Sequence, residues 1–253
     1  MRVLITVEYY GKNYAGWQRQ KNALAVQQVL EEKLGLILQT KVVLVASGRT
    51  DRGVHALRQK AHFDYEGFFP VKKMAYAVNT TLPDDIRVLE AIEVPSDLHA
   101  QYSAKRKTYL YKMYVSRTLH PVKNLLSAQI SYDDVDFDKM QEACKDLIGT
   151  HDFAAFAATG SHVKNTVRTV FDASLRREGE DIEFEITGNG FLYNMVRIAV
   201  GTLVWIGIGK LPVTAVQDML LTGDRKKGGK TLPPHGLYLK DVFYEDLSSL
   251  PLE

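Results

Sequence analysis

The chain has 253 residues, of which 45% are hydrophobic and 25% are charged, and its formal net charge is +2. This composition is typical of a globular protein with one large domain or two small ones. The single cysteine, Cys144, excludes an internal disulfide and a cysteine-rich zinc site, and we expect it to be buried in a helix. The longest apolar run, Ile198 to Ile208, is too short to cross a bilayer. The N-terminus lacks a signal-peptide pattern, so we expect a cytoplasmic protein without membrane contact.

The first half of the chain alternates strand and helix patterns. Period-two alternation and β-branched residues predict strands, whereas apolar residues at helical spacing predict helices. In chain order, the pattern predicts a strand at Arg2–Tyr10, a helix at Val26–Leu38, strands at Val42–Ala46 and Leu57–Tyr65, a helix at Val71–Asn79 and a strand at Ile86–Val94. The order β-α-β-β-α-β is that of a ferredoxin-like unit, in which two helices cover one face of an antiparallel sheet.

The second half repeats this order loosely. Its predicted elements are a strand at Lys105–Val115, a helix at Phe137–Ile148, hairpin strands at Val167–Arg176 and Asp181–Thr187, helices at Phe191–Gly207 and Val213–Leu221, and a strand at Leu237–Tyr244. We therefore predict an α+β protein of two ferredoxin-like, or RRM-like, halves. The predicted domains are residues 1–104 and 105–253, with the active-site cleft between them.

Several common site motifs fail on spacing or context. Gly229-Lys230-Thr231 lacks the earlier glycine of a phosphate-binding P-loop. Gly207 and Gly209 lack the third glycine of a dinucleotide site, because Pro212 stands there. The seven histidines show no metal-ligand spacing, no G-x-S-x-G elbow is present, and residues 160–162 are predicted to form a loop. These failures speak against metal, nucleotide and serine-hydrolase chemistry.

One polar loop between two predicted strands carries a concentration of reactive groups. Within Gly48–Ala56, Asp51 stands among Arg49, Arg52 and His55. Reactive side chains often sit on loops that a rigid sheet holds. A lone aspartate in a glycine-rich loop more often caps backbone N–H groups, however. The residues alone leave both interpretations open.

Gly48–Ala56 closely resembles the catalytic motif of the tRNA pseudouridine synthase A family, G-R-T-D-x-G-V-H. Six further segments resemble motifs of that family in the same order: Tyr14–Gln18 with Val26-Gln27, Ser103-Ala104 with Tyr109–Tyr111, Gly149–Phe153, Thr166–Arg168, Asn189–Arg197 and Pro233–Leu239. Because the seven matches are collinear and span nearly the whole chain, the resemblance is specific.

The resemblance implies a tRNA pseudouridine synthase that isomerises uridine at positions 38, 39 and 40 of the anticodon arm without a cofactor or metal. It implies Asp51 as the catalytic carboxylate, which attacks either the ribose or the base. It also implies that Arg197 pairs with this carboxylate and keeps it ionised, since an opposite charge favours the charged form. Tyr109 matches the active-site tyrosine, which stacks on the flipped uracil.

The remaining candidate substrate-binding residues lie in or beside the matching motifs: Arg49, His55, Trp17, Gln18, Arg168 and Asn194. For Trp17, a buried core position is an equal alternative. The family also works as a homodimer in which one tRNA contacts both subunits, and no DNA is expected to bind.

Clustered cations and four departures from the family pattern bear on the RNA partner. Basic groups stand at Arg49–Lys60, Lys105–Lys107 and Arg225–Lys230, where they indicate either phosphate-binding surface or ordinary solvated faces. The departures are Arg52, Gln101, Ile198 and Leu232. They leave open which tRNA positions are served.

Two rival functions remain. A non-catalytic protein of two RRM-like halves would bind RNA without changing it, but the usual RRM strand motif is absent from the sequence. A carboxylate-dependent nucleoside hydrolase would release free uracil.

Overall fold

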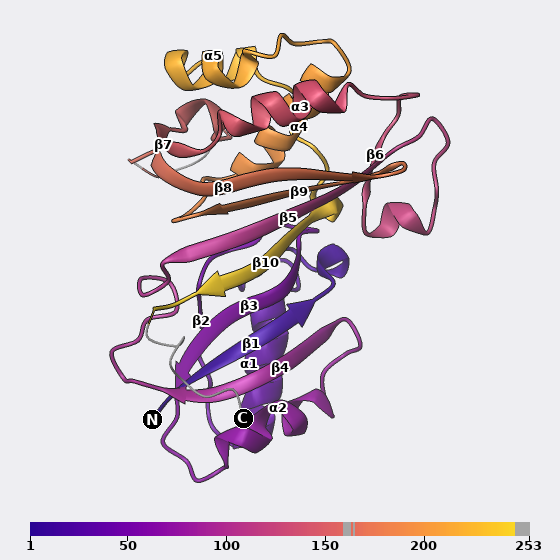
Figure 1. Cartoon of the computed structure of the whole chain (residues 1–253). Coiled ribbons are helices and arrows are strands. Elements are labelled where there is room, and N and C mark those ends of the chain that lie inside the picture. The colour runs from indigo at the N-terminus through magenta and orange to yellow at the C-terminus, as the bar shows by residue number, and fades with distance from the viewer. Residues whose placement is uncertain (159–162, 164, 246–253) are drawn as a thin grey trace. The chain divides into compact units, whose positions relative to one another are not determined.

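The computed structural model describes residues 1–158, 163 and 165–245 (Figure 1). The chain forms two compact units. Unit 1 contains Met1–Lys105 together with the chain from Tyr238 onward, and unit 2 contains Arg106–Leu237. The last strand, which we predicted within residues 105–253, therefore belongs with the first unit. The predicted loop at residues 160–162 lies outside the described residues.

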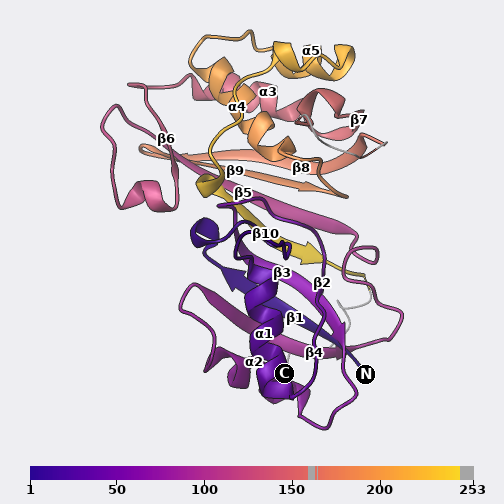
Figure 2. The same ribbon diagram turned by 180° about the vertical axis from the view of Figure 1, so that it is seen from behind.

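Unit 1 follows the predicted element order. Its strands are β1 (Arg2–Tyr9), β2 (Val45–Ala46), β3 (His55–Asp64), β4 (Ile86–Val94) and β10 (Leu237–Phe243), and its helices are α1 (Val26–Leu38) and α2 (Val71–Asn79). β1 is antiparallel to both β3 and β4, β2 is antiparallel to β3, and β10 runs parallel to β3 through two residue pairs. Figure 2 shows α1 on one face of this sheet. β3 begins two residues earlier than predicted, at His55, directly after the Asp51 loop.

Strand β1 and helix α1 contribute apolar side chains to the core of unit 1. In β1 every residue from Val3 to Val7 is buried, so both faces of this strand are covered. Residues at helical spacing in α1 are buried as well (Val26, Leu30 and Leu34). Burying such side chains contributes roughly 1.5–3 kcal/mol each. The apolar side chains of β1 and α1 therefore supply a large part of the core of unit 1.

Unit 2 contains strands β5 (Arg106–Val115), β6 (Ala128–Ile130), β7 (Gly149–Asp152), β8 (Val167–Glu178) and β9 (Asp181–Gly188), with helices α3 (Phe137–Lys145), α4 (Met195–Gly207) and α5 (Ala215–Thr222). β5, β9, β8 and β7 pair in that order as antiparallel neighbours, and β6 runs parallel to β5. In Figures 1 and 2, α3 and α4 lie on one face of these strands. Cys144 of α3 is buried as predicted, and burial raises the pKa of its thiol to about 12.

The start of α4 differs from the prediction because of one backbone angle. Phe191 was expected to open this helix, but Asn194 adopts φ +61°, so the helix begins at Met195. Asparagine tolerates this left-handed conformation better than most residues, although a helix cannot continue through it. The sequence pattern alone did not reveal the break, since Phe191 and Leu192 fit the apolar spacing of the helix.

A glycine contact fixes the segment Gly229–Leu232, at the end of the basic group Arg225–Lys230, against α4. A Cβ at Gly201 of α4 would overlap the carbonyl oxygen of Lys230, so only glycine allows this approach. The N–H of Gly229 donates to Thr202 Oγ1 at 3.1 Å, and that of Leu232 donates to the carbonyl of Arg197 at 3.2 Å. The glycine that suggested a P-loop therefore serves packing against α4.

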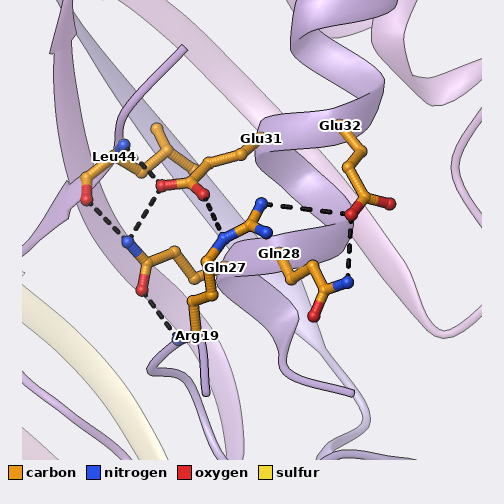
Figure 3. A network of polar contacts seen from close by, with 6 residues as sticks. All are labelled: Arg19, Gln27, Gln28, Glu31, Glu32 and Leu44. Atoms are coloured by element: carbon orange, nitrogen blue, oxygen red, sulfur yellow. Dashed lines mark hydrogen bonds and ion pairs between the residues drawn. The ribbon is translucent and has the colours of Figure 1, made fainter. Parts of the chain in front are cut away.

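A buried carboxylate ties α1 to the strand region ahead of the Asp51 loop (Figure 3). Glu31 accepts hydrogen bonds from Arg19 Nε at 2.8 Å, from Gln27 Nε2 at 2.9 Å and from the backbone N–H of Leu44 at 3.0 Å. Gln27 Nε2 also donates to the carbonyl of Leu44 at 3.0 Å. Both backbone groups of Leu44 are thus satisfied by α1, which sets where the chain enters β2.

This network predicts different costs for two adjacent glutamates of α1. Replacing Glu31 by alanine leaves the buried Leu44 N–H without its acceptor and removes one of the two acceptors of Gln27 Nε2. We therefore expect the free energy of unfolding to fall by about 3 kcal/mol. Glu32 is exposed, and its carboxylate oxygen lies 4.0 Å from the guanidinium of Arg19, which is a long and weak ion pair. Glu32→Ala should therefore lower the free energy of unfolding by at most about 0.5 kcal/mol. Urea denaturation of both variants measures the difference, and equal losses would contradict the anchoring role.

Candidate active site

The Asp51 loop, Ser47–Val54, joins β2 to β3 in unit 1 and is fixed at both ends. Ser47 Oγ donates to Gln59 Oε1 at 2.6 Å, and Gln59 Nε2 donates to the carbonyl of Gly48 at 3.0 Å. The N–H of Val54 donates to the carbonyl of Asp51 at 3.1 Å and closes a turn through Gly53, whose φ is +79°. Asp51 is half-buried at the centre of this loop. The glycine that gives the motif its shape is therefore required by the backbone angle.

Two glycines of the loop between β1 and α1, which we call the first loop, lie in close contact with the Asp51 loop. A Cβ at Gly11 would overlap the carbonyl oxygen of Val54. Gly16 has φ +91°, and a Cβ there would lie 2.5 Å from the carbonyl oxygen of Thr50 and 3.1 Å from the carbonyl carbon of Asp51. The N–H of Trp17 donates to the same Thr50 carbonyl at 3.1 Å. Backbone thus packs on backbone, which leaves no room for the loop to shift.

Trp17 packs beneath the protein surface next to the Asp51 loop, and its ring is not accessible to a ligand. Its side chain is 1% exposed, and its ring lies 5.9 Å from that of Tyr9. Tyr9 in turn shares a hydrogen bond of 2.8 Å with Thr50 Oγ1, one residue before Asp51. The predicted RNA contact by Trp17 is therefore wrong in this structure, and the buried alternative holds. Its neighbour Gln18 is exposed and stays a candidate.

His55 is likewise a structural residue, contrary to our prediction that it binds substrate. It is 1% exposed and its ring lies between Tyr10, at 4.9 Å, and Tyr238, at 4.8 Å. Its Nδ1 accepts the backbone N–H of Gly11 at 3.0 Å. Because both ring faces are covered and one ring nitrogen is used, His55 fastens the first loop and β10 to the start of β3. Arg49, by contrast, is exposed and remains available for substrate.

Unit 2 positions Arg197 through backbone and side-chain acceptors. From α4, its Nε donates to the carbonyl of Leu232 at 2.7 Å and its Nη1 donates to Asn194 Oδ1 at 2.6 Å. Tyr111 lies close enough for the charge of Arg197 to oppose the rise that burial causes in the tyrosine pKa. The Tyr111 hydroxyl donates to the carbonyl of Pro233 at 2.8 Å. Asn194, which we predicted to bind substrate, orients Arg197, and sequence reasoning missed the bracing by Tyr111.

Tyr109 occupies β5, two residues before Tyr111. It is half-buried, and its ring meets that of Phe191 edge to face at 5.1 Å and 80°. Such an arrangement fixes the plane of an aromatic ring while leaving part of it accessible.

Two cations of unit 2 lie near each other beside the glycines that precede Phe191. Lys107 of β5 pairs in register with Gly188, and Arg168 of β8 packs near Gly190. Burial, together with the charge of Arg168, lowers the pKa of Lys107 to about 8. Burial also lowers the pKa of Arg168. Adjacent cations that repel each other in this way favour an anionic ligand such as phosphate.

The structure thus organises the predicted residues in two sets. Unit 1 carries Asp51 with Arg49 in the same loop and with Gln18, which follows the residue whose N–H binds the Thr50 carbonyl. Unit 2 carries Arg197, Tyr109 and Arg168. The pairing of Asp51 with Arg197 stays a prediction. Among the described residues, no group of three or more His, Cys, Asp or Glu side chains is arranged to hold a metal ion. None of the helices in the described part has the length and apolar character of a membrane-crossing segment.

Comparison with known proteins decides the family. The tRNA pseudouridine synthase family model matches residues 5–103 and 143–245. This chain belongs to the tRNA pseudouridine synthase family. Among its relatives, tRNA pseudouridine synthase A of Thermoanaerobacter sp. (strain X514) is 47% identical over 96% of this chain and 99% of the relative. The synthase A of Acetivibrio thermocellus is 45% identical over 96% and 99% of the two chains, and that of Bacillus licheniformis 42% over 97% and 100%.

Family membership confirms the broad prediction that the protein is an isomerase acting on tRNA uridine. Among solved structures, an archaeal box H/ACA sRNP Nop10–Cbf5 complex aligns with 92% of this synthase and 46% of the matched chain at 12% identity, with a TM-score of 0.36. That score is too low to add to the argument. The family assignment rests on the sequence relatives.

The close contact at Gly16 allows a test of whether the Asp51 loop is rigid. In Gly16→Ala the new methyl group collides with the Thr50 carbonyl and displaces Asp51, so we expect kcat to fall about 100-fold with little change in tRNA affinity. Gly179→Ala is the matched control, because Gly179 also has a positive φ, of 59°, but no atom lies within 4 Å of its Cβ position. Single-turnover kinetics measures both variants. Full activity in Gly16→Ala would contradict a rigid loop.

Proposed function

We propose that this synthase isomerises uridines 38, 39 and 40 of the tRNA anticodon arm, with Asp51 as its catalytic carboxylate and without a cofactor. The observation that carries the proposal is the Asp51 loop itself. It matches the family motif and is held by close glycine contacts and backbone hydrogen bonds. A loop fixed in this way presents one carboxylate in one orientation, as a nucleophile requires.

The reaction moves a bond without net oxidation or reduction. The N1–ribose bond of uridine breaks, the uracil turns, and a new carbon–carbon bond joins C5 to the ribose. C5 gives up a proton and N1 gains one, so atoms and electrons balance within the substrate. The Asp51 carboxylate adds to the ribose or to the base, which divides one difficult step into two easier ones.

Arg197 supplies the opposite charge that Asp51 needs. An ionised carboxylate is the attacking form, and a nearby guanidinium favours ionisation. Two acceptors orient Arg197, the Leu232 carbonyl at 2.7 Å from Nε and Asn194 Oδ1 at 2.6 Å from Nη1. Arg197 is half-buried, and a planar guanidinium held in a fixed orientation is suited to pairing with a carboxylate.

Tyr109 serves the base that leaves the RNA stack. An enzyme acting on a base within a stem must extrude it, at a cost of a few kcal/mol. The Tyr109 ring contacts Phe191, and its accessible part provides a face on which the flipped uracil stacks. Tyr109 also assists removal of the C5 proton. Stacking on an aromatic ring offsets part of the unstacking cost.

The phosphate backbone positions the RNA. Arg49 and Gln18 are exposed in or beside the Asp51 loop and contact phosphate groups there. Arg168 and Lys107 form a second, cationic, phosphate-binding site. Such contacts set register without reading sequence. We further propose that the synthase works in the cytoplasm as a homodimer, with one tRNA contacting both subunits.

The carboxylate role predicts the outcome of Asp51→Asn. The amide is nearly the same size but is a poor nucleophile, so we expect kcat to fall by roughly 10⁴-fold while tRNA binding is retained. Asp84→Asn is the control, because Asp84 is an exposed residue paired with Arg87 at the surface. Undermodified tRNA is incubated with each variant and pseudouridine is mapped along the anticodon arm.

The same assay separates the rivals. Release of free uracil, detected by chromatography, would indicate a nucleoside hydrolase. Binding without any product from the wild-type protein would indicate an RNA-binding module. Pseudouridine formed by Asp51→Asn at the wild-type rate would contradict the assignment of the carboxylate.

Phosphate binding predicts a steep dependence of tRNA affinity on salt. The logarithm of the association constant should fall linearly with the logarithm of salt concentration, and Lys107→Ala should reduce that slope by about one. Lys145→Ala, which removes an exposed cation at the end of α3, should leave the slope unchanged. Fluorescence anisotropy at several salt concentrations measures all three proteins. A flat response in the wild type would remove the proposed role of these cations.

A further inference from the structure

A rigid aromatic platform lies in unit 1 at the far end of β3 from the Asp51 loop. β3 starts at His55, directly after that loop, and His62 stands seven residues further along. At about 3.3 Å per residue, the strand separates the two positions by about 23 Å. The platform is therefore distinct from the site at which the uridine reacts.

Three rings build the platform. Tyr102 stacks on His99 with ring centroids 4.3 Å apart and an interplanar angle of 26°. His99 meets His62 edge to face at 5.0 Å and 65°. His62 is buried in the sheet, whereas Tyr102 is 78% exposed. One face of the Tyr102 ring is thus covered by protein, and the opposite face is open to solvent.

The turn that carries His99 and Tyr102 is fixed by hydrogen bonds to its backbone. His99 Nδ1 accepts the N–H groups of Gln101 and Tyr102, each at 3.2 Å. Ser103 Oγ accepts the N–H of His99 at 2.9 Å, and His62 Nδ1 accepts the N–H of Ala100 at 3.1 Å. Each bond fixes either a ring or the peptide next to it. The Tyr102 ring is therefore held in place before any ligand arrives.

Two further contacts join this turn to the sheet. The Tyr244 hydroxyl donates to the carbonyl of Ala100 at 2.6 Å, and Arg2 Nη1 donates to the carbonyl of Leu98 at 2.9 Å. Burial lowers the pKa of His62 to about 4, with the charge of Arg2 contributing. His62 is therefore neutral near pH 7 and keeps the Nδ1 lone pair that holds Ala100.

The chemistry of the open surface matches a nucleobase. A single exposed aromatic residue is common on protein surfaces. Here the ring is prestacked and rigid, so a flat ligand would lose little entropy from the protein side on binding. Gln101, also exposed, is adjacent in sequence and carries an amide that can donate to and accept from the edge of a base. An unpaired base offers both a π-face and such an edge.

We propose that Tyr102 and Gln101 bind one unpaired nucleobase of the tRNA at a site remote from the reacting uridine. The inference uses the tRNA substrate that family membership establishes and does not depend on the catalytic role proposed for Asp51. Base–aromatic stacking alone would strengthen tRNA binding about tenfold. Gln101 is one of the four departures from the family pattern, so the preference for the bound base should be a property of this chain.

The first test compares three tyrosine variants by their Kd for tRNA, measured in the Asp51→Asn background so that no turnover occurs. Tyr102→Ala should weaken binding about tenfold, whereas Tyr102→Phe, which keeps the ring, should stay within about twofold of the parent. Tyr76→Ala is the matched control, because Tyr76 is 79% exposed on α2 and lies in no ring contact among those described. Thermal melting should be the same for all variants, since both tyrosines are exposed.

Three outcomes would overturn the platform. Tyr102→Ala could bind tRNA like the parent, Tyr102→Phe could lose as much affinity as Tyr102→Ala, or Tyr76→Ala could show the same loss. The second outcome would point to a hydroxyl hydrogen bond in place of stacking, and the third to a general surface effect. A failed Asp51 assignment would leave this binding comparison intact, so the two failures are distinguishable.

A second test locates the base. Single abasic nucleotides are placed at each unpaired position of the tRNA, and each RNA is titrated with the parent and with Tyr102→Ala. At one position the abasic substitution should remove the tenfold difference between the two proteins. If the difference persists at every unpaired position, the ring contacts no single base and the proposal is wrong.

Discussion

Backbone-on-backbone packing between the first loop and the Asp51 loop is the constraint on which the proposed chemistry depends. Gly11 and Gly16 lack the Cβ that would overlap or crowd the carbonyls of Val54 and Thr50. The hydrogen bond from Trp17 to Thr50 then fixes the register of the two loops. Because the contact involves main chain on both sides, no rotamer change can relieve a displacement. The backbone position of Asp51 is therefore set during folding, before RNA binds.

Unit 2 uses the same physical strategy for its own charged group. Arg197 is held by a backbone carbonyl at Leu232, and that segment is in turn pressed against α4 by the contact of Gly201 with Lys230. Asn194, the left-handed residue directly before the helix, adds a second acceptor. Preorganised groups of this kind reduce the reorganisation needed when charge develops in a reaction. Both predicted catalytic charges thus rest on glycine-dependent packing.

The sequence predicted the elements better than the environment of individual side chains. Periodicity identified the main helices and the longer strands of both units, because burial imposes those periods on the residues themselves. It missed β6 and β7, which have only three and four residues and are too short to show a period. The motif G-R-T-D likewise located the loop. Trp17 and His55 were misjudged, since an aromatic residue with a polar tip suits either a binding surface or a buried contact. Only the fold shows that rings cover His55 on both faces.

Site geometry escaped prediction where it depends on main-chain angles and on partners distant in sequence. No local pattern indicates that Asn194 turns left-handed, or that Tyr111 braces the segment at Pro233. The aromatic platform at Tyr102 was missed for the same reason, because His62 and His99 are 37 residues apart and meet only through the fold.

Amide hydrogen exchange tests the claim of a preorganised loop most directly. The N–H groups of Trp17 and Val54 donate to the carbonyls of Thr50 and Asp51, and their rates can be measured by NMR in the protein without RNA. If the loop is fixed before substrate binds, both amides should exchange as slowly as those in the centre of β3. Exchange at the rate of an unprotected surface loop, slowing only when tRNA is added, would show that the substrate orders the loop and would contradict the account.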